Sequence, residues 1–153
     1  MKLQKWYSEI VWLIVSIILA VAVLLPIKTS VPDYPFYAYN LIYVFGAVHF
    51  TRYIFLLKYT PFSHSKWFKL IVIFTAIPAI VLLIDGMAEF QAEWDYTGFQ
   101  EFLGHLRPDK HNALSRYIRS EFIFLGVTTV ISAIILPIRM IISLWRVRNR
   151  NTV

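Results

Sequence analysis

The chain has 153 residues, of which 58% are hydrophobic, 17% are aromatic and only 16% are charged. Together with a mean hydropathy of +0.60, this composition excludes an ordinary water-soluble domain and indicates an integral membrane protein. The net charge of +6 does not indicate a nucleic-acid partner, because the sequence has no basic stripe with interleaved aromatic residues and no nucleic-acid-binding motif. The absence of cysteine excludes disulfides, thiolate nucleophiles and cysteine-ligated metal centres.

Four apolar segments are each close to the roughly 20 residues that a helix needs to cross about 30 Å of hydrocarbon. They lie near residues 9–28, 36–57, 69–88 and 121–145. Short connections follow the first and second segments, so we expect antiparallel neighbours there. The sequence therefore predicts an all-α fold: a single membrane domain over residues 1–153, built as a four-helix bundle.

The first apolar segment resembles a secretory signal. Lys2 and Lys5 precede it, and the sequence Ala-Val-Ala at residues 20–22 resembles a cleavage site. The apolar run continues past that site to Ile27, and Glu9 interrupts the basic leader. We therefore expect a retained transmembrane helix.

Basic residues gather at one set of segment ends, and cytoplasmic loops of membrane proteins carry an excess of such residues. The set comprises Lys2, Lys5, Lys58, Lys66, Lys69, Arg146, Arg148 and Arg150. The short loop at the opposite side has only Lys28. The distribution predicts a multi-pass protein of the cell (inner, cytoplasmic) membrane with both termini in the cytoplasm.

The segment between the third and fourth spans, residues 89–120, is the only connection large enough to have structure of its own. Thr97 and Gln100 stand at the spacing of a helix-capping box. The residues that follow place four apolar side chains on one helical face: Phe99, Phe102, Leu103 and Leu106. This pattern predicts a short amphipathic helix on the membrane or against the bundle. A new helix is expected from about Lys110, running unbroken into the fourth span.

Four polar residues fall within the membrane near the predicted cytoplasmic side. Glu9, Arg52 and Arg139 are expected at one depth on three helices, with His49 a turn deeper on the face of Arg52. Arg52 alone is explained by snorkelling, in which its stem reaches the headgroups. If the side chains instead face inward, one carboxylate cannot neutralise two guanidinium groups, and the surplus cation needs an acidic residue of a partner or a lipid phosphate. The layer therefore predicts a partner- or lipid-binding site.

A second group of charges lies near the outer side. Asp85, Glu89 and Glu93 recur every four residues and would share one face if the third span continues outward. Arg116 and Arg119, at the outer end of the fourth span, are their expected ion-pair partners. The group predicts either a solvated face with a few ion pairs or a site for a cation or a basic partner.

No pattern in the sequence indicates a metal, a cofactor or a catalytic site. His105 and His111 flank Asp109, but their spacing matches no standard metal site, and Pro108 separates the two histidines. A single intramembrane histidine, His49, more often makes a hydrogen bond between helices than it ligates haem. No serine or threonine has a recognisable histidine and carboxylate arrangement around it.

The favoured hypothesis is a non-catalytic accessory or scaffold subunit that packs against other integral membrane subunits or its own copies, in contact with membrane lipids. The alternative is a small homo-oligomeric channel or transporter for ions or protons that uses Asp85, Glu89 and His49. A third hypothesis is an envelope- or lipid-modifying enzyme. Its acid and base would come from His105, Asp109, His111 and Glu121.

Overall fold

The structure is a computed structural model that describes residues 2–149. Within that range it is all-helical and contains no β-strand. Two short 3₁₀ turns, Leu57–Tyr59 and Pro61–His64, connect the second and third helices. The helices are α1 (Lys2–Ser30), α2 (Tyr37–Leu56), α3 (Lys66–Thr97), α4 (Gln100–Leu103) and α5 (Pro108–Asn149).

Four of these helices are long and apolar enough to cross a membrane, as the prediction of four spans requires. The apolar helical stretches are Lys5–Ser30, Tyr37–Tyr59, Lys66–Thr97 and Pro108–Arg146. Two of them are longer than the apolar segments alone indicated, because α3 continues to Thr97 and α5 begins at Pro108. The unbroken fourth helix that was expected from about Lys110 is therefore present and starts two residues earlier.

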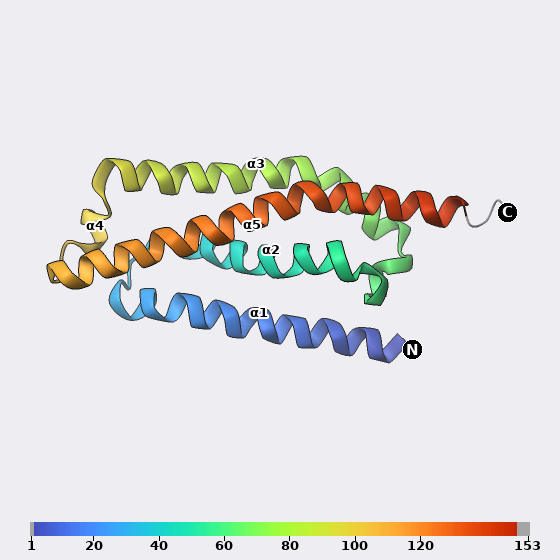
Figure 1. The fold of residues 1–153 in the computed structure, drawn as a ribbon, viewed down its shortest axis with the longest axis horizontal. Helices are drawn as coiled ribbons and strands as arrows, with labels where there is room; N and C mark the ends of the chain where they lie inside the picture. The colour runs from blue at the N-terminus through green and yellow to red at the C-terminus, as the bar shows by residue number, and fades with distance from the viewer. Residues whose placement is uncertain (1, 150–153) are drawn as a thin grey trace.

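The long helices lie side by side, and both chain termini point to the same end of the molecule (Figure 1). We call this end the terminal end, and the end that holds α4 and the α1–α2 turn the far end. Helix α5 packs along both α2 and α3, whereas α1 packs mainly along α2. We expected α1 to pack on α2 and α2 to pack on α3. The first pair is present, whereas α3 packs mainly on α5. Which end faces the cytoplasm stays a prediction.

Aromatic side chains fill the far half of the molecule. The rings of Phe90 (α3) and Phe122 (α5) are stacked, with centroids 3.8 Å apart and planes 7° apart. Tyr43 meets Phe122 edge-on at 5.0 Å, and its hydroxyl donates a hydrogen bond of 2.7 Å to the Leu83 carbonyl. Such ring pairs add about 0.5–1.5 kcal/mol each beyond the area that they bury. This core therefore fixes α2, α3 and α5 together at the far end.

The chain turns sharply between α3 and α4. Gly98 and Phe99 both adopt left-handed backbone conformations, with φ of 56° and 64°. That conformation is uncommon for a residue with a side chain, and the complete burial of the Phe99 ring in the core stabilises it here. The Thr97 hydroxyl donates to the Glu93 carboxylate and accepts from the Phe99 amide, so Thr97 closes α3 and does not cap α4. Because α4 is a single turn, the amphipathic character of this segment stays a prediction.

Candidate functional site

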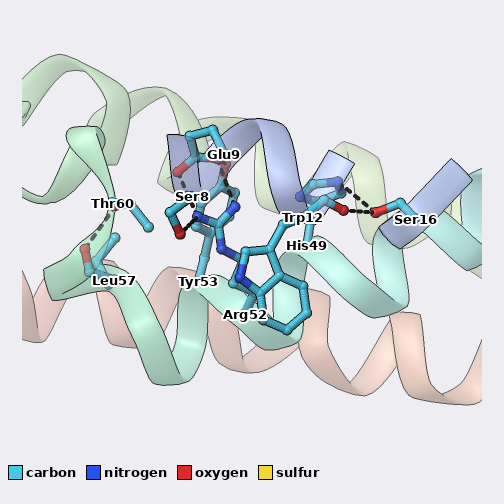
Figure 2. A network of polar contacts seen from close by, with 9 residues as sticks. All are labelled: Ser8, Glu9, Trp12, Ser16, His49, Arg52, Tyr53, Leu57 and Thr60. Carbon is cyan, nitrogen blue, oxygen red and sulfur yellow. Dashed lines mark hydrogen bonds and ion pairs between the residues drawn. The ribbon is translucent and has the colours of Figure 1, made fainter. Parts of the chain in front are cut away.

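Arg52 and Glu9 form a two-pronged ion pair between α2 and α1 (Figure 2). Arg52 Nη1 lies 2.7 Å from Glu9 Oε2, and Nη2 lies 2.9 Å from Oε1. A further bond of 3.2 Å runs from Nη2 to the Ser8 hydroxyl. This ion pair is the only salt bridge among the side chains that the structure describes, which are those of residues 5–146 and 149, and Arg52 is only 4% exposed. Arg52 is therefore directed between two helices, so snorkelling does not describe it.

Aromatic rings enclose this ion pair. The Arg52 guanidinium lies 5.6 Å from the ring centroids of both Trp12 and Tyr53, within the range of cation–π attraction. The Tyr53 hydroxyl donates to Glu9 Oε2 at 3.3 Å. The positive charge is thus neutralised and largely desolvated where it stands. Such an arrangement joins α1 to α2 through a charge-assisted, two-pronged contact.

His49 lies one turn deeper and also joins α2 to α1. The Ser16 hydroxyl donates to the Trp12 carbonyl at 2.8 Å, so it accepts from His49 Nε2, 3.1 Å away. This geometry assigns the imidazole proton to Nε2. The His49 ring is also stacked on Phe45, with centroids 6.0 Å apart. The prediction that His49 makes a hydrogen bond between helices is confirmed.

Arg139 does not join the Arg52 and Glu9 pair, contrary to the expectation of one layer. Its Nε donates to the Ile54 carbonyl of α2 at 3.0 Å, so it binds backbone at the end of that helix. The charged side chain close to Arg139 is that of Lys69 in α3, which is only 1% exposed. The two positive charges are near enough to repel each other. No carboxylate within the described chain lies within ion-pair distance of either cation. The expected layer is therefore split into a neutralised pair and an unneutralised cationic pair, Lys69 and Arg139.

The outer charged residues are not paired as expected. Asp85 and Glu89 lie exposed on α3. The Glu93 carboxylate accepts a hydrogen bond of 2.6 Å from the Thr97 hydroxyl. Arg119 lies over the Trp94 ring, 4.6 Å from its centroid, and makes no ion pair with the acidic residues in the described chain. The ion pairs predicted from Arg116 and Arg119 are therefore absent from residues 2–149.

The residues considered for acid–base chemistry or metal binding are also separate. His105 is exposed, with Nε2 3.3 Å from the Ser30 carbonyl, and Asp109 is exposed in the first turn of α5. His111 is half-buried on α5, and Glu121 lies further along the same helix toward the core. Among residues 2–149 no group of three histidine or acidic side chains is placed to hold a metal ion.

Sequence reasoning missed a polar cluster at the far end. Asn40 of α2 is completely enclosed, and its Nδ2 donates to Glu121 Oε1 of α5 at 2.6 Å. Tyr34, in the α1–α2 turn, is buried beside them. Burial raises the pKa of Tyr34 far above its usual value, so this phenol is neutral. The available signal was an asparagine within an otherwise apolar span, which is an unusual place for an amide.

Comparisons of the chain with protein-family models, with curated proteins and with solved structures find no match. Any functional assignment must therefore come from the geometry of the residues themselves. Two features stand out on that basis: the cationic pair at the terminal end and the polar cluster at the far end.

Proposed function

We propose that the protein is a non-catalytic accessory or scaffold subunit of a larger membrane complex. The observation that supports this proposal is the cationic pair Lys69 and Arg139. These residues lie near each other at the terminal end of α3 and α5, and neither has an acidic partner in residues 2–149. The proposed partner is an integral membrane protein that presents an aspartate or glutamate at this depth.

Electrostatics favours an anion at this position. Two like charges repel each other, and burying a cation without a counter-charge is unfavourable by several kcal/mol. Lys69 also lies in the first turn of α3, which begins at Lys66, and the helix dipole makes the start of a helix partly positive. The Ile54 carbonyl accepts from Arg139 but carries no full negative charge. A carboxylate from outside the chain would relieve all of these unfavourable terms.

Apolar surface beside the cations supports a protein as the source of that carboxylate. Ile71 of α3 is 59% exposed and Ile138 of α5 is 54% exposed, both within one turn of a cation. Arg139 is half-buried and therefore partly open to a partner, while the enclosed Lys69 contributes charge. An acidic residue within an apolar helix of the partner matches this surface. A lipid phosphate is the competing occupant.

Arg139 is a better position than Arg52 for a substitution that tests this proposal. Replacing Arg52 would break its ion pair with Glu9 and weaken the contact between α1 and α2, so loss of a partner would not be specific. Arg139→Gln keeps a donor at the position of Nε for the Ile54 carbonyl and removes the charge together with the two terminal nitrogens. Arg116→Gln, an exposed change on the same helix, is the matched control. Each protein is expressed at native level, extracted in mild detergent, and analysed for particle mass and stoichiometric subunits.

The proposal predicts that wild-type and Arg116→Gln protein co-purify with the same subunit. Arg139→Gln should lose most of it while remaining folded and inserted. Equal recovery of the subunit with Arg139→Gln would contradict the proposal. Loss of bound anionic phospholipid with no change in protein subunits would instead assign the site to a lipid.

The location is part of the proposal as well. The basic residues at the terminal end, including Lys58 and Lys66, support a cytoplasmic position for both termini in the cell membrane. Modification of cysteines introduced singly near each end by a membrane-impermeant reagent tests this orientation, because the chain has no cysteine of its own. Labelling of the terminal end in intact cells would contradict it.

The structure offers less support for the other two hypotheses. A channel built from Asp85, Glu89 and His49 would need these groups along one route, but the first two lie exposed on α3 and His49 lies between α1 and α2. For an enzyme, the acid or base would be His105, Asp109, His111 or Glu121, but the first two are exposed and Glu121 is bonded to Asn40 in the core. No arrangement within one copy of the described chain favours either function.

A further inference from the structure

The polar cluster at the far end contains three buried atoms without a protein partner. They are Tyr34 Oη, Asn40 Oδ1 and Glu121 Oε2. Tyr34 is 3% exposed and Asn40 is fully enclosed, so these atoms have little access to solvent. Buried polar groups are nearly always hydrogen-bonded, which makes three unpaired atoms in one cluster informative.

The charge of Glu121 would also be unbalanced if this side chain were ionised. Within residues 2–149 no lysine, arginine or histidine lies within ion-pair distance of its carboxyl group. The charged or titratable groups that face the cluster are phenols: Tyr34 from the α1–α2 turn, Tyr37 from α2 and Tyr117 from α5. Asp33 lies beyond Tyr37 and would add only further negative charge. A buried carboxylate without a cation is strongly unfavourable.

None of the three phenols around Glu121 donates to its Oε2, because Tyr117 and Tyr37 donate elsewhere and Tyr34 Oη makes no hydrogen bond to it. Tyr117 directs its hydroxyl to the Val23 carbonyl of α1 at 2.8 Å, and Tyr37 directs its own to the Val31 carbonyl at 2.9 Å. Asn40 already donates to the other carboxyl oxygen, Glu121 Oε1. As a carboxylate, Glu121 would therefore have one strong donor for two oxygens.

A single proton resolves both problems. On Glu121 Oε2 it removes the negative charge and converts an unpaired acceptor into a donor. Asn40 Oδ1 belongs to the same amide that donates to Oε1, so the acid and the amide can be joined by two hydrogen bonds. We propose that Glu121, Asn40 and Tyr34 form a buried proton-binding site in which Glu121 is a neutral carboxylic acid.

Binding of a proton at this site would determine how tightly the helices pack at the far end. The acid–amide contact joins α5 to α2, and Tyr34 anchors the α1–α2 turn against them, 5.6 Å from the Phe102 ring of α4. Loss of the proton leaves a carboxylate among aromatic side chains, which would loosen these contacts. The far end should therefore be tight when the proton is bound and loose when it is removed.

Infrared spectroscopy of the purified protein in lipid nanodiscs tests the proposal directly. A protonated carboxylic acid gives a carbonyl-stretch band that an ionised carboxylate lacks, and the band shifts in deuterated water. We expect this band at neutral pH in wild-type protein and in the control Glu89→Gln, which changes an exposed glutamate of α3. Glu121→Gln should lose the band.

Glu121→Gln also provides a test through stability, because glutamine has the shape and the donor and acceptor of the neutral acid. This variant should fold and should keep its melting temperature at high pH, where wild-type protein loses stability. A wild-type protein without the band, or a Glu121→Gln variant that does not fold, would overturn the proposal. A band that disappears when choline is replaced by sodium at constant pH would also overturn it, because the site would then hold a metal cation.

Discussion

The ion pair between Arg52 and Glu9 allows a quantitative test of how α1 is held to α2. The two partners are not equally enclosed, since the Arg52 side chain is 1% exposed and the Glu9 side chain 14%. Removing one partner of a buried pair typically costs about 3–5 kcal/mol, because the other charge is left uncompensated. The cost of each single substitution should therefore depend on which charge is left behind.

Glu9→Gln leaves the guanidinium of Arg52 enclosed by Trp12 and Tyr53, with no route to water. We expect this variant to lose stability within that range, by about 4 kcal/mol. Arg52→Met leaves Glu9, which keeps partial exposure and the Tyr53 hydroxyl as a donor. We expect a smaller loss for Arg52→Met, about 2 kcal/mol.

The double variant separates the ion pair from the general packing. Glu9→Gln with Arg52→Met removes both charges and keeps similar side-chain volumes, so we expect a stability within about 1 kcal/mol of wild type. The free energy of unfolding is measured for all four proteins in the same mixed micelles, which gives the coupling energy of a double-mutant cycle. A double variant as unstable as the sum of the single variants would refute the reasoning, because the charges would then not interact. A larger loss for Arg52→Met than for Glu9→Gln would refute the exposure argument.

Two further substitutions test the packing between helices. Phe90→Leu should destabilise the protein by about 1 kcal/mol because the stack on α5 is lost, whereas the control Phe74→Leu, at a side chain that is 78% exposed on the same helix, should have almost no effect in thermal unfolding. Gly46→Ala should cost about 1–3 kcal/mol because its Cβ would overlap the side chain of Thr129, and combining it with Thr129→Ser should recover most of that loss. A fully stable Gly46→Ala protein would show that α2 and α5 do not approach closely there.

The sequence predicts the long helices, and the levels along the bundle at which Glu9, Arg52 and His49 lie, for a physical reason. Length and apolar composition are sufficient to define a membrane span, and the rise per residue then fixes how deep each side chain lies. Glu9 and Arg52 were expected at one level from this argument alone, and the structure pairs them. His49 was expected one turn deeper on the same face and is found there.

The rotation of each helix about its axis was not predictable in the same way. A soluble helix shows which face is buried through its polar stripe, but a membrane helix is apolar on both its lipid face and its buried face. Arg139 therefore could not be assigned to α2 backbone in preference to Glu9 from its position in the chain. Lys69 was counted among the basic residues at the segment ends, although the structure encloses it near Arg139 of α5. The contact between Asn40 and Glu121 joins residues 81 positions apart and needs the rotations of both helices.

The same physics explains the positions of the two polar clusters along α2. Since lipid is as apolar as the buried side chains, the membrane does not penalise a helix that turns a different apolar face inward. Polar contacts do penalise it, because a rotated or shifted helix leaves donors and charges unpaired in hydrocarbon. Arg52 fixes α2 against α1 near one end, and Asn40 fixes it against α5 near the other. Two separated contacts define both the rotation and the register of a helix, which one contact alone would leave adjustable. The central position of α2 is thus set by polar residues near its ends, with the aromatic core and the close approach at Gly46 filling the space between them.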